Sequence, residues 1–424
     1  MSEHIEIIEH STLSRGEETK GTTLSETDFA QLKEFIFSTA EKNQDYYLQI
    51  TSKNGKELIK AKNYVGSILL PSGTTIDILP KIESAGVDSK KLLIEMLSTL
   101  KDSPYITSRF ANLDTEHLPL FELFIRMFVD EIDRLQKYGL RSKYVAREEN
   151  LSSFKGKLLI TEQIRHNFAH AERFYVQYDD YNINRPINRL IKASLELLQR
   201  KSTDWKNKKD IARLLDVLDE VESSRNYEID IAKVDLDRNM TEFHQVFAWC
   251  KVFLRKKSFT SFSGDTAAMA LLFDMNKLFE SYVAARLRKY IPNLKTQVRK
   301  KSLFDAPECF ELRPDLLIEG ENPIILDTKW KVLDENQNNY GISQSDMYQM
   351  YVYQKRFRAK EIVLLYPKPD WDVSKKDIMY TANESEKVIV KVRFVDLGWG
   401  AEQDDKKLKP GSWKAFAEEI LVGE

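Results

Sequence analysis

The 424-residue chain has little of what several large classes of protein require. It contains only two cysteines, Cys250 and Cys309, which provide no disulfide framework and indicate a reducing compartment. No run of about 18 apolar residues occurs, and the first residues contain no apolar signal core. We therefore expect a soluble, cytoplasmic protein that has no contact with a membrane and no zinc site.

Two further absences concern nucleotides and nucleic acids. The P-loop motif G-x-x-x-x-G-K-[ST] does not occur, so we expect this chain to bind no nucleotide of its own. The formal net charge is only −2, which is not typical of a nucleic-acid binder. Local basic clusters such as Arg299-Lys300-Lys301 could still contact phosphates, although such clusters are more often solvated faces.

Periodicity divides the chain into three regions and predicts an α+β multidomain protein. Turn signals at Asn54-Gly55 and Pro71-Ser72-Gly73, between β-branched and aromatic runs, predict a small β-rich module in residues 1–88, which also holds a capped helix at 25–42. Apolar residues at three- and four-residue spacing predict a mostly helical middle region, 89–262. Residues 263–424 predict an α/β domain with a mixed sheet.

Within this last region the elements are expected in a definite order. A helix near residues 269–290 is followed by a strand at 295–302, by two strands that each carry an aspartate, by a helix at 343–357 and by a strand at 361–367. The two aspartate strands, 309–320 and 322–332, are joined by a tight turn at 320–323. An antiparallel pairing across this turn places Asp315 opposite Asp327.

Two carboxylates in this arrangement indicate a site for a hard cation. Side chains alternate along a strand, so Asp327 and Lys329 share one face while Thr328 points to the other. Carboxylate oxygens are the ligands that Mg²⁺ prefers, and we expect Mg²⁺, or Mn²⁺ in its place, at Asp315 and Asp327. Lys329 would orient or help to deprotonate a water, or neutralise charge on a phosphate.

The alternative is a pair of solvated carboxylates. An acidic residue two positions before a lysine also occurs at Glu18-Thr19-Lys20 and at Asp88-Ser89-Lys90. Neither of these follows an apolar run, whereas Ile324-Ile325-Leu326 leads directly into Asp327, as in a buried central strand. A buried aspartate costs free energy unless its charge is compensated, and this context favours the metal site.

The flanking helices supply further candidates. Glu280 borders an apolar stripe in the first helix and is either a third metal-binding carboxylate, directly or through water, or an ordinary salt-bridging residue. Asp346, Gln349 and Tyr353 share one face of the second helix, where Gln349 and Tyr353 could bond the lysine, a water or a phosphate.

A histidine pair in the middle region offers a weaker site. His166 and His170 have i, i+4 spacing, but no glutamate stands in the zinc-protease position and no third ligand is evident. A polar contact at the surface or between helices is the favoured interpretation.

The motifs at Pro314-Asp315 and Asp327-Thr328-Lys329 resemble those of the PD-(D/E)xK nuclease superfamily. More narrowly, the segments DMNKLFESYV, RPDLLI, ILDTKWK and SDMYQMYVY, in this order, resemble the McrC subunits of McrBC-type modification-dependent restriction systems. NYVGSILLPSGTTIDILPKI and INRPINRLIKASLELL fit the same family, so the likeness covers most of the chain.

This resemblance implies a restriction-endonuclease-like C-terminal domain and a set of roles. Asp315, Asp327 and Glu280 would bind the metal, Lys329 would be the catalytic lysine and Gln349 a supporting residue. It further implies a Mg²⁺-dependent DNA endonuclease subunit whose first two regions dock on an McrB-like AAA+ GTPase hexamer and stimulate its GTP hydrolysis. The substrate would be double-stranded, modified DNA.

Two other functions stay open from the sequence. The chain could be a non-catalytic regulatory subunit of an AAA+ NTPase, against which the intact set of Asp315, Asp327 and Lys329 argues. It could also be a nuclease that acts alone on single-stranded or branched DNA. DNA cleavage assayed with and without the partner separates the three.

Overall fold

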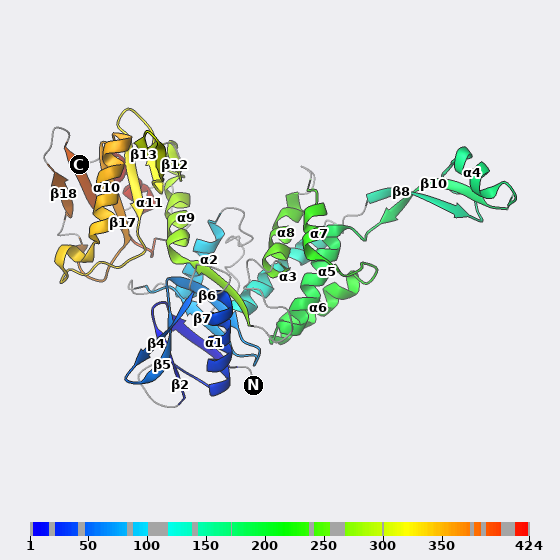
Figure 1. Cartoon of the computed structure of the whole chain (residues 1–424), viewed down its shortest axis with the longest axis horizontal. Coiled ribbons are helices and arrows are strands. Elements are labelled where there is room, and N and C mark those ends of the chain that lie inside the picture. Colours follow the sequence, from blue (N-terminus) through cyan, green and yellow to red (C-terminus); the bar gives the residue numbers. More distant parts are fainter. Residues whose placement is uncertain are drawn as a thin grey trace. The chain divides into compact units, whose positions relative to one another are not determined.

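The computed structural model divides the chain into two compact units. Unit 1 comprises residues 1–120 and 264–424, and unit 2 comprises residues 121–263 (Figure 1). The structure describes residues 3–16, 22–40, 47–82, 88–100, 118–137, 143–170, 172–236, 241–254, 268–298, 301–373, 377–382, 387–399 and 412–422.

Unit 1 begins with two four-stranded sheets that share one core. Their orders are β1-β7-β6-β11 and β3-β2-β5-β4. A single buried cluster joins both sheets to Phe29, Leu32 and Phe35 of α1, and Ser25 Oγ accepts a hydrogen bond from the Asp28 amide, as the predicted cap requires. The first elements are β1 (His4–Ile8), β2 (Thr12–Arg15), β3 (Thr22–Leu24), α1 (Glu26–Ala40), β4 (Leu48–Lys53), β5 (Lys56–Ala61), β6 (Tyr64–Leu69) and β7 (Thr75–Leu79).

The fourth strand of the first sheet comes from beyond unit 2. β11 (Met269–Asp274) pairs antiparallel with β6, and Gly66 permits this approach because a Cβ there would lie 1.9 Å from the Leu271 carbonyl oxygen. The predicted helix start near residue 269 was wrong, since α9 (Met275–Leu287) begins only after its cap, Asp274. A short apolar run fits a helix or a strand equally well, and the available edge of β6 favours the strand.

The last third of the chain forms a six-stranded mixed sheet of order β12-β15-β16-β17-β19-β18. β16, β17 and β19 run parallel, and the remaining strands are antiparallel to their neighbours. β16 and β17 are buried along their whole length, as central strands should be. The strands are β12 (Leu294–Thr296), β15 (Leu316–Ile318), β16 (Ile324–Thr328), β17 (Glu361–Pro367), β18 (Met379–Ala382) and β19 (Val388–Val395).

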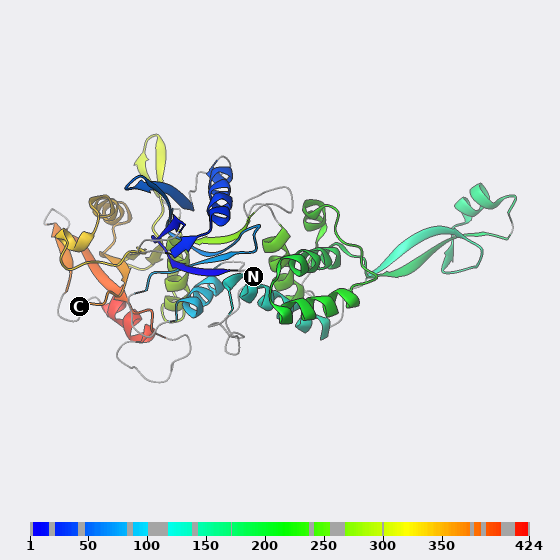
Figure 2. The same ribbon diagram turned by 90° about the horizontal axis from the view of Figure 1, so that it is seen from below.

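Helices cover both faces of this sheet. Met350, Tyr353 and Phe357 of α10 (Gln344–Phe357) pack in one buried cluster with alternate residues of β16, β17 and β19. α9 contacts β16, and α11 (Trp413–Val422) packs on α9. Figure 2 shows α10 and α11 on opposite sides of the sheet.

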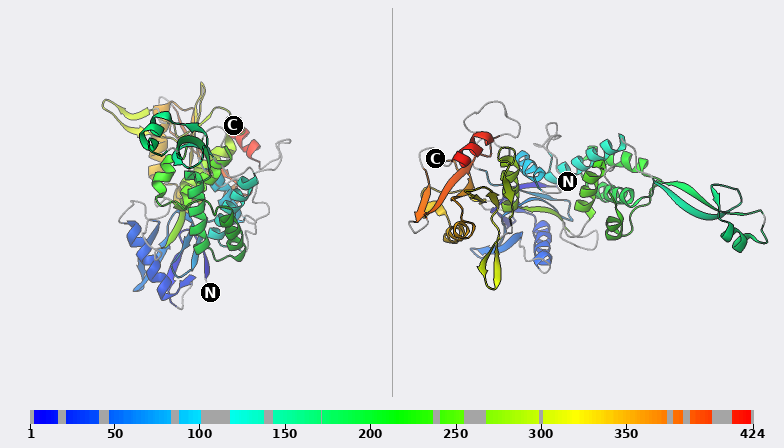
Figure 3. Two further views of the ribbon diagram at one scale, coloured as in Figure 1. Left: turned by 90° about the vertical axis from the view of Figure 1, so that its right-hand side faces the viewer. Right: turned by 90° about the horizontal axis from the view of Figure 1, so that it is seen from above.

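A separate two-stranded hairpin precedes the aspartate strands. It consists of β13 (Lys301–Asp305) and β14 (Glu308–Leu312) and projects from the sheet (Figure 3). The predicted continuous strands 295–302 and 309–320 were therefore wrong, since each is divided between the hairpin and the sheet. Pro314 explains the second break, because a proline has no N–H to donate to a ladder.

Unit 2 contains a helical bundle centred on α5, which contacts α6, α7 and α8. Pro186 occupies the first turn of α5, where its missing N–H costs nothing. Trp249 of α8 stacks on Phe253 at 5.3 Å between ring centroids and is buried. The helices are α3 (Leu120–Lys137), α5 (Pro186–Lys201), α6 (Trp205–Val217), α7 (Tyr227–Lys233) and α8 (Thr241–Leu254).

Unit 2 also contains a β arm that the helical pattern did not predict. β8 (Lys143–Leu151) and β10 (Phe174–Asn182) form an antiparallel ladder that leads away from the helices, with α4 (Ile160–Asn167) at its tip (Figure 1). The two-residue strand β9 (Lys157–Leu158) also pairs with β10.

The predicted fold class is confirmed: strands at the N-terminus, helices in the middle and a mixed sheet at the C-terminus. The predicted regions 1–88, 89–262 and 263–424 do not coincide with the two units, because residues 89–120, which include α2 (Ser89–Ser98), belong to unit 1. Among the described helices, none has both the length and the apolar character needed to span a membrane.

Candidate functional site

The two aspartates meet at the junction of β15 and β16. The ladder pairs Leu316 with Leu326, and the same register places Asp315 opposite Asp327, as the sequence predicts. Asp315 Oδ2 accepts hydrogen bonds from the amide and the hydroxyl of Thr328, each at 2.8 Å. These two bonds fix the Asp315 carboxylate against the end of β16.

Asp327 is a nearly inaccessible carboxylate with few partners. The residue is 1% exposed and forms an ion pair with Lys329 Nζ. The ion pair is with Asp327 Oδ2, and among the described residues no donor other than Lys329 reaches this oxygen. Burial, and then the neighbouring charge of Asp315, raise the pKa of Asp327 to about 7 although Lys329 opposes the shift.

Lys329 keeps its positive charge in this setting. Burial lowers the pKa of Lys329, but the charges of Asp327 and then Asp315 and Asp346 outweigh it, so the pKa is raised. Asp346 lies in the first turn of α10, where the Asp346 amide donates to Ser343 Oγ at 3.1 Å. The lysine is therefore a fixed cation beside two carboxylates.

Glu280 is held near Asp315 by a residue that the sequence did not reveal. Gln297 Nε2 donates to Glu280 Oε1 at 3.0 Å, Arg313 donates to Gln297 Oε1, and the Gln297 amide donates to the Asp315 carbonyl at 2.9 Å. Burial and then the charge of Asp315 raise the pKa of Glu280. Gln297 has a φ of +48°, a left-handed conformation that is uncommon for glutamine.

The second helix is connected to the same loop. Gln349 Nε2 donates to the Tyr353 hydroxyl at 2.8 Å, and this hydroxyl donates to the Arg313 carbonyl at 3.0 Å. Burial is the first cause that raises the pKa of Tyr353. The predicted pair of Gln349 and Tyr353 thus supports the backbone that leads into Asp315. These two hydrogen bonds do not involve Lys329, which pairs with Asp327.

A second missed residue connects the site to the N-terminal sheets. Trp330, which follows Lys329, donates its indole N–H to Glu9 Oε1 at 2.6 Å, and its ring lies 5.3 Å from that of Phe279. Glu9 is 2% exposed and also accepts from the Lys81 amide at 2.9 Å. Residues 321 positions apart thereby join the first sheets to the end of β16, which carries Asp327.

The donor set at Asp315, Asp327 and Glu280 consists of carboxylate oxygens, which suit Mg²⁺ or Mn²⁺. Lys329 compensates the charge of the buried Asp327 carboxylate only in part, because the pKa of Asp327 stays raised. The three carboxylates do not converge as one group, because within the described residues only His4, Glu6 and Asp77 bring three potential ligand atoms within 4.8 Å of one another. The residues fit a cation at Asp315 and Asp327, with Glu280 farther out.

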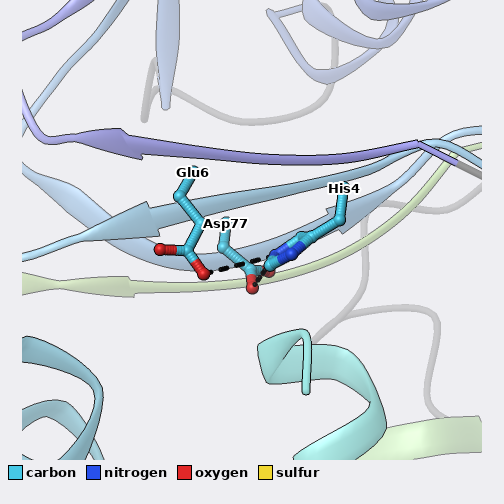
Figure 4. Close-up of side chains that lie close together, drawn as sticks. All are labelled: His4, Glu6 and Asp77. Carbon is cyan, nitrogen blue, oxygen red and sulfur yellow. Dashed lines mark hydrogen bonds and ion pairs between the residues drawn. The ribbon is translucent and has the colours of Figure 1, made fainter. Parts of the chain in front are cut away.

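The group of His4, Glu6 and Asp77 is a satisfied polar network (Figure 4). Asp77 Oδ1 accepts from Ser67 Oγ at 2.6 Å, and Asp77 Oδ2 lies 2.8 Å from both His4 Nε2 and the Leu120 amide nitrogen. Glu6 forms an ion pair with Lys90. Each acid already has a partner, so the group is structural.

The histidines of the arm make polar contacts, as the sequence favoured. His166 Nε2 lies 3.2 Å from Glu162 Oε2 and its ring stacks on Tyr175, while His170 Nδ1 lies 3.1 Å from Glu172 Oε1.

Comparisons with known proteins point to the family that the sequence motifs resemble. The model of the family described as "McrBC 5-methylcytosine restriction system component" matches residues 59–367. The fold resembles a chain in the refined half-complex from the tetradecameric assembly of Thermococcus gammatolerans McrB AAA+ hexamers with bound McrC, with a TM-score of 0.72, 19% identity and 99% of each chain covered. A chain of the T. gammatolerans McrBC complex, solved by cryo-EM, gives a TM-score of 0.54 at 20% identity, covering 71% of this chain and 90% of that one. No curated protein matches.

Proposed function

This chain belongs to the family of McrBC 5-methylcytosine restriction system components, and we propose that it is the McrC-type DNA endonuclease subunit of such a system. The observation that carries the proposal is the pair of Asp315 and Asp327 beside Lys329, in which burial and the charge of Asp315 raise the pKa of Asp327 to about 7 although Lys329 forms an ion pair with it. Hydrolysis of a phosphodiester bond is the reaction that this set of groups supports.

Asp315 and Asp327 would hold Mg²⁺ or Mn²⁺, with Glu280 as a further ligand, directly or through water. When bound, such a cation supplies Lewis acidity to phosphodiester hydrolysis. Lys329 Nζ, which is already fixed by Asp327, orients the attacking water or neutralises charge on the phosphate. Gln349 acts through Tyr353 on the loop that carries Asp315.

The proposed partner is an AAA+ GTPase of the McrB type. The T. gammatolerans complex with a similar fold contains McrB AAA+ hexamers with bound McrC, and this chain contains no P-loop motif. An AAA+ partner would supply the GTP hydrolysis and the recognition of modified double-stranded DNA that the system requires.

The tip of the arm is the surface that favours a protein partner. Ile160, Ile164 and Phe168 are 67%, 62% and 91% exposed, and their four-residue spacing places them along one side of α4. Phe154 nearby is 60% exposed. An apolar stripe of this kind marks a protein interaction site, and we assign it to the docking of the GTPase.

The catalytic assignment is tested by Asp327→Ala and Lys329→Ala. Each change should lower DNA cleavage with Mg²⁺, GTP and partner by at least about 100-fold, because Asp327→Ala removes a proposed metal ligand and Lys329→Ala removes a fixed charge at the reacting phosphate. Stimulation of GTP hydrolysis should stay near wild type, which shows that the variants fold and dock. Cleavage at the wild-type rate by either variant would refute the site.

The docking assignment is tested by the double change Ile164→Asp and Phe168→Asp. GTPase stimulation should fall at least about tenfold, because burying two charges in an apolar interface is unfavourable. Trp205→Asp, at a residue of α6 that is 71% exposed, is the matched control and should have no effect. Full stimulation by the double variant would place the docking surface elsewhere.

A further inference from the structure

The hairpin of β13 and β14 carries an exposed pair of aromatic rings. Phe304 is 54% exposed and Phe310 is 70% exposed, and their rings meet edge to face with centroids 6.0 Å apart. Figure 3 shows the hairpin standing clear of the sheet. Side chains of this size are buried in most proteins, so a solvent-facing pair needs an explanation.

The backbone is strained at one of the two rings. Phe310 has a φ of +59°, a conformation that is a genuine outlier for a bulky residue. The ladder pairs Phe304 with Cys309 and Ser302 with Glu311 but omits Phe310. Strain of this kind persists only where the surroundings enforce it, and it gathers at functional positions.

The hairpin is braced against the helix that supports the candidate site. The guanidinium of Arg356 in α10 binds Asp305 through two hydrogen bonds, of 3.1 and 2.5 Å, a geometry that fixes direction as well as distance. Lys301 Nζ donates to the Arg356 carbonyl at 2.5 Å, so both ends of β13 are tied to α10. The aromatic pair is therefore presented on a fixed support.

The position of the pair relates it to the candidate metal site. Phe310 and Asp315 are only five positions apart in the sequence, which limits their distance to about 18 Å. That is about five base steps of a DNA duplex at 3.4 Å per step. A duplex held at Asp315 and Asp327 is within reach of the hairpin.

We propose that Phe304 and Phe310 form a wedge that inserts between two base pairs of DNA close to the scissile phosphate. The inference rests on the proposed nuclease function and adds a contact with the bases. Apolar side chains inserted at a base step unstack it and kink the duplex. The wedge would bend the DNA into the site.

Area favours a DNA base step over a protein partner. Arg356 neutralises Asp305 through two hydrogen bonds, and the two phenylalanine rings offer DNA an apolar contact with base faces and none with phosphates. Two phenylalanines bury a few hundred Å² at most, which is well below the roughly 800 Å² per partner of a stable protein interface. The pair fits one base step.

The test measures unstacking with 2-aminopurine. Duplexes carry this fluorescent base at successive positions and are bound by the full chain, assembled with its GTPase, with Ca²⁺ in place of Mg²⁺ to prevent cleavage. The wild type should raise the fluorescence severalfold at one step. Phe304→Ala with Phe310→Ala should abolish the rise and weaken DNA binding at least about fivefold, since stacking on an aromatic ring is worth at least that factor. Phe310→Tyr should retain the signal.

The matched control is Phe37→Ala, at a residue of α1 that is 55% exposed, and it should behave as wild type. An unchanged fluorescence rise and affinity in the double variant would overturn the wedge, while Asp327-dependent cleavage in the same preparation would keep the nuclease function. A change of self-association in the double variant without DNA would assign the rings to a contact between copies, and would also overturn the wedge. Absence of any Asp327-dependent cleavage would overturn both proposals.

Discussion

Two aspartates are buried in different sheets of unit 1, and they differ in the groups that bond their carboxylates. Asp77 in β7 is fully buried and is bonded by Ser67, the Leu120 amide and His4. Asp327 in β16 is equally inaccessible, but its Oδ2 has only the ion pair with Lys329, and burial raises its pKa to about 7. Three groups bond Asp77, whereas Lys329 compensates the charge of Asp327 only in part.

The comparison also separates proximity from function. His4, Glu6 and Asp77 bring three ligand atoms together, yet every one of these side chains already has a partner. Asp315 and Asp327 form a looser set, in which Lys329 compensates the charge of the buried Asp327 carboxylate only in part. A buried carboxylate whose charge is only partly compensated is a better guide to a binding site than a short distance between ligand atoms.

The largest expected effect is on stability at Asp77. Asp77→Ala leaves the Ser67 hydroxyl and the Leu120 amide without their acceptor, and each buried unsatisfied group costs about 1–3 kcal/mol. The free energy of unfolding of the full chain should fall by about 3 kcal/mol in a denaturant titration followed by circular dichroism. A loss below about 0.5 kcal/mol would show that the hydrogen bonds to Asp77 do not stabilise the fold.

Asp327→Asn should stabilise the metal-free protein, whereas Asp77→Ala should destabilise it. A carboxyl whose folded pKa lies above its unfolded value stabilises the fold only at low pH, and this contribution is lost as the pH rises through about 7. At pH 8 in EDTA the neutral asparagine should therefore raise the melting temperature, and at pH 4 the difference should vanish. A lower melting temperature at pH 8 would mean that the carboxylate is structurally compensated, as at Asp77.

A smaller effect is expected at Gln297, which connects Glu280 to the Asp315 loop. Gln297→Ala should weaken Mn²⁺ binding, measured by calorimetry, by about tenfold, the order found when a group that orients a metal ligand is removed. In Glu280→Ala the further loss of Gln297 should change little, because both act on the same carboxylate. Fully additive effects would show that Gln297 acts independently of Glu280.

The sequence was sufficient for the parts of the site that depend on local pattern. The register of Asp315 and Asp327 follows from two apolar runs and the turn between them, and α10 with Gln349 and Tyr353 follows from helical spacing. Both features involve residues that are close in the chain and are therefore constrained by strand and helix periodicity.

The missed features depend on contacts that no local pattern contains. Trp330 bonds Glu9, which is 321 positions away in the sequence. Gln297 adopts a left-handed backbone conformation, which a glutamine in the sequence does not predict. β11 is a strand because β6 offers an edge, although its apolar run permits a helix. Periodicity alone predicted one strand through Pro314, but the chain forms two strands there, β14 and β15.

Glu9 is an intermediate case between the two aspartates, and it provides the smallest and most discriminating test. Its Oε1 accepts from Trp330 and Lys81, but among the described residues no hydrogen bond reaches Oε2, and His10 Nε2 is 3.9 Å away. Burial raises the pKa of Glu9 above its usual value of 4.5, so the stability it provides is present below that pH and is lost as the pH rises through the raised pKa. Glu9→Gln keeps an acceptor for Trp330 and removes the charge, so its melting temperature should match the wild type at pH 4 and exceed it slightly at pH 8. Equal melting temperatures at both pH values would place Glu9 with Asp77, as a carboxylate whose charge the fold already compensates.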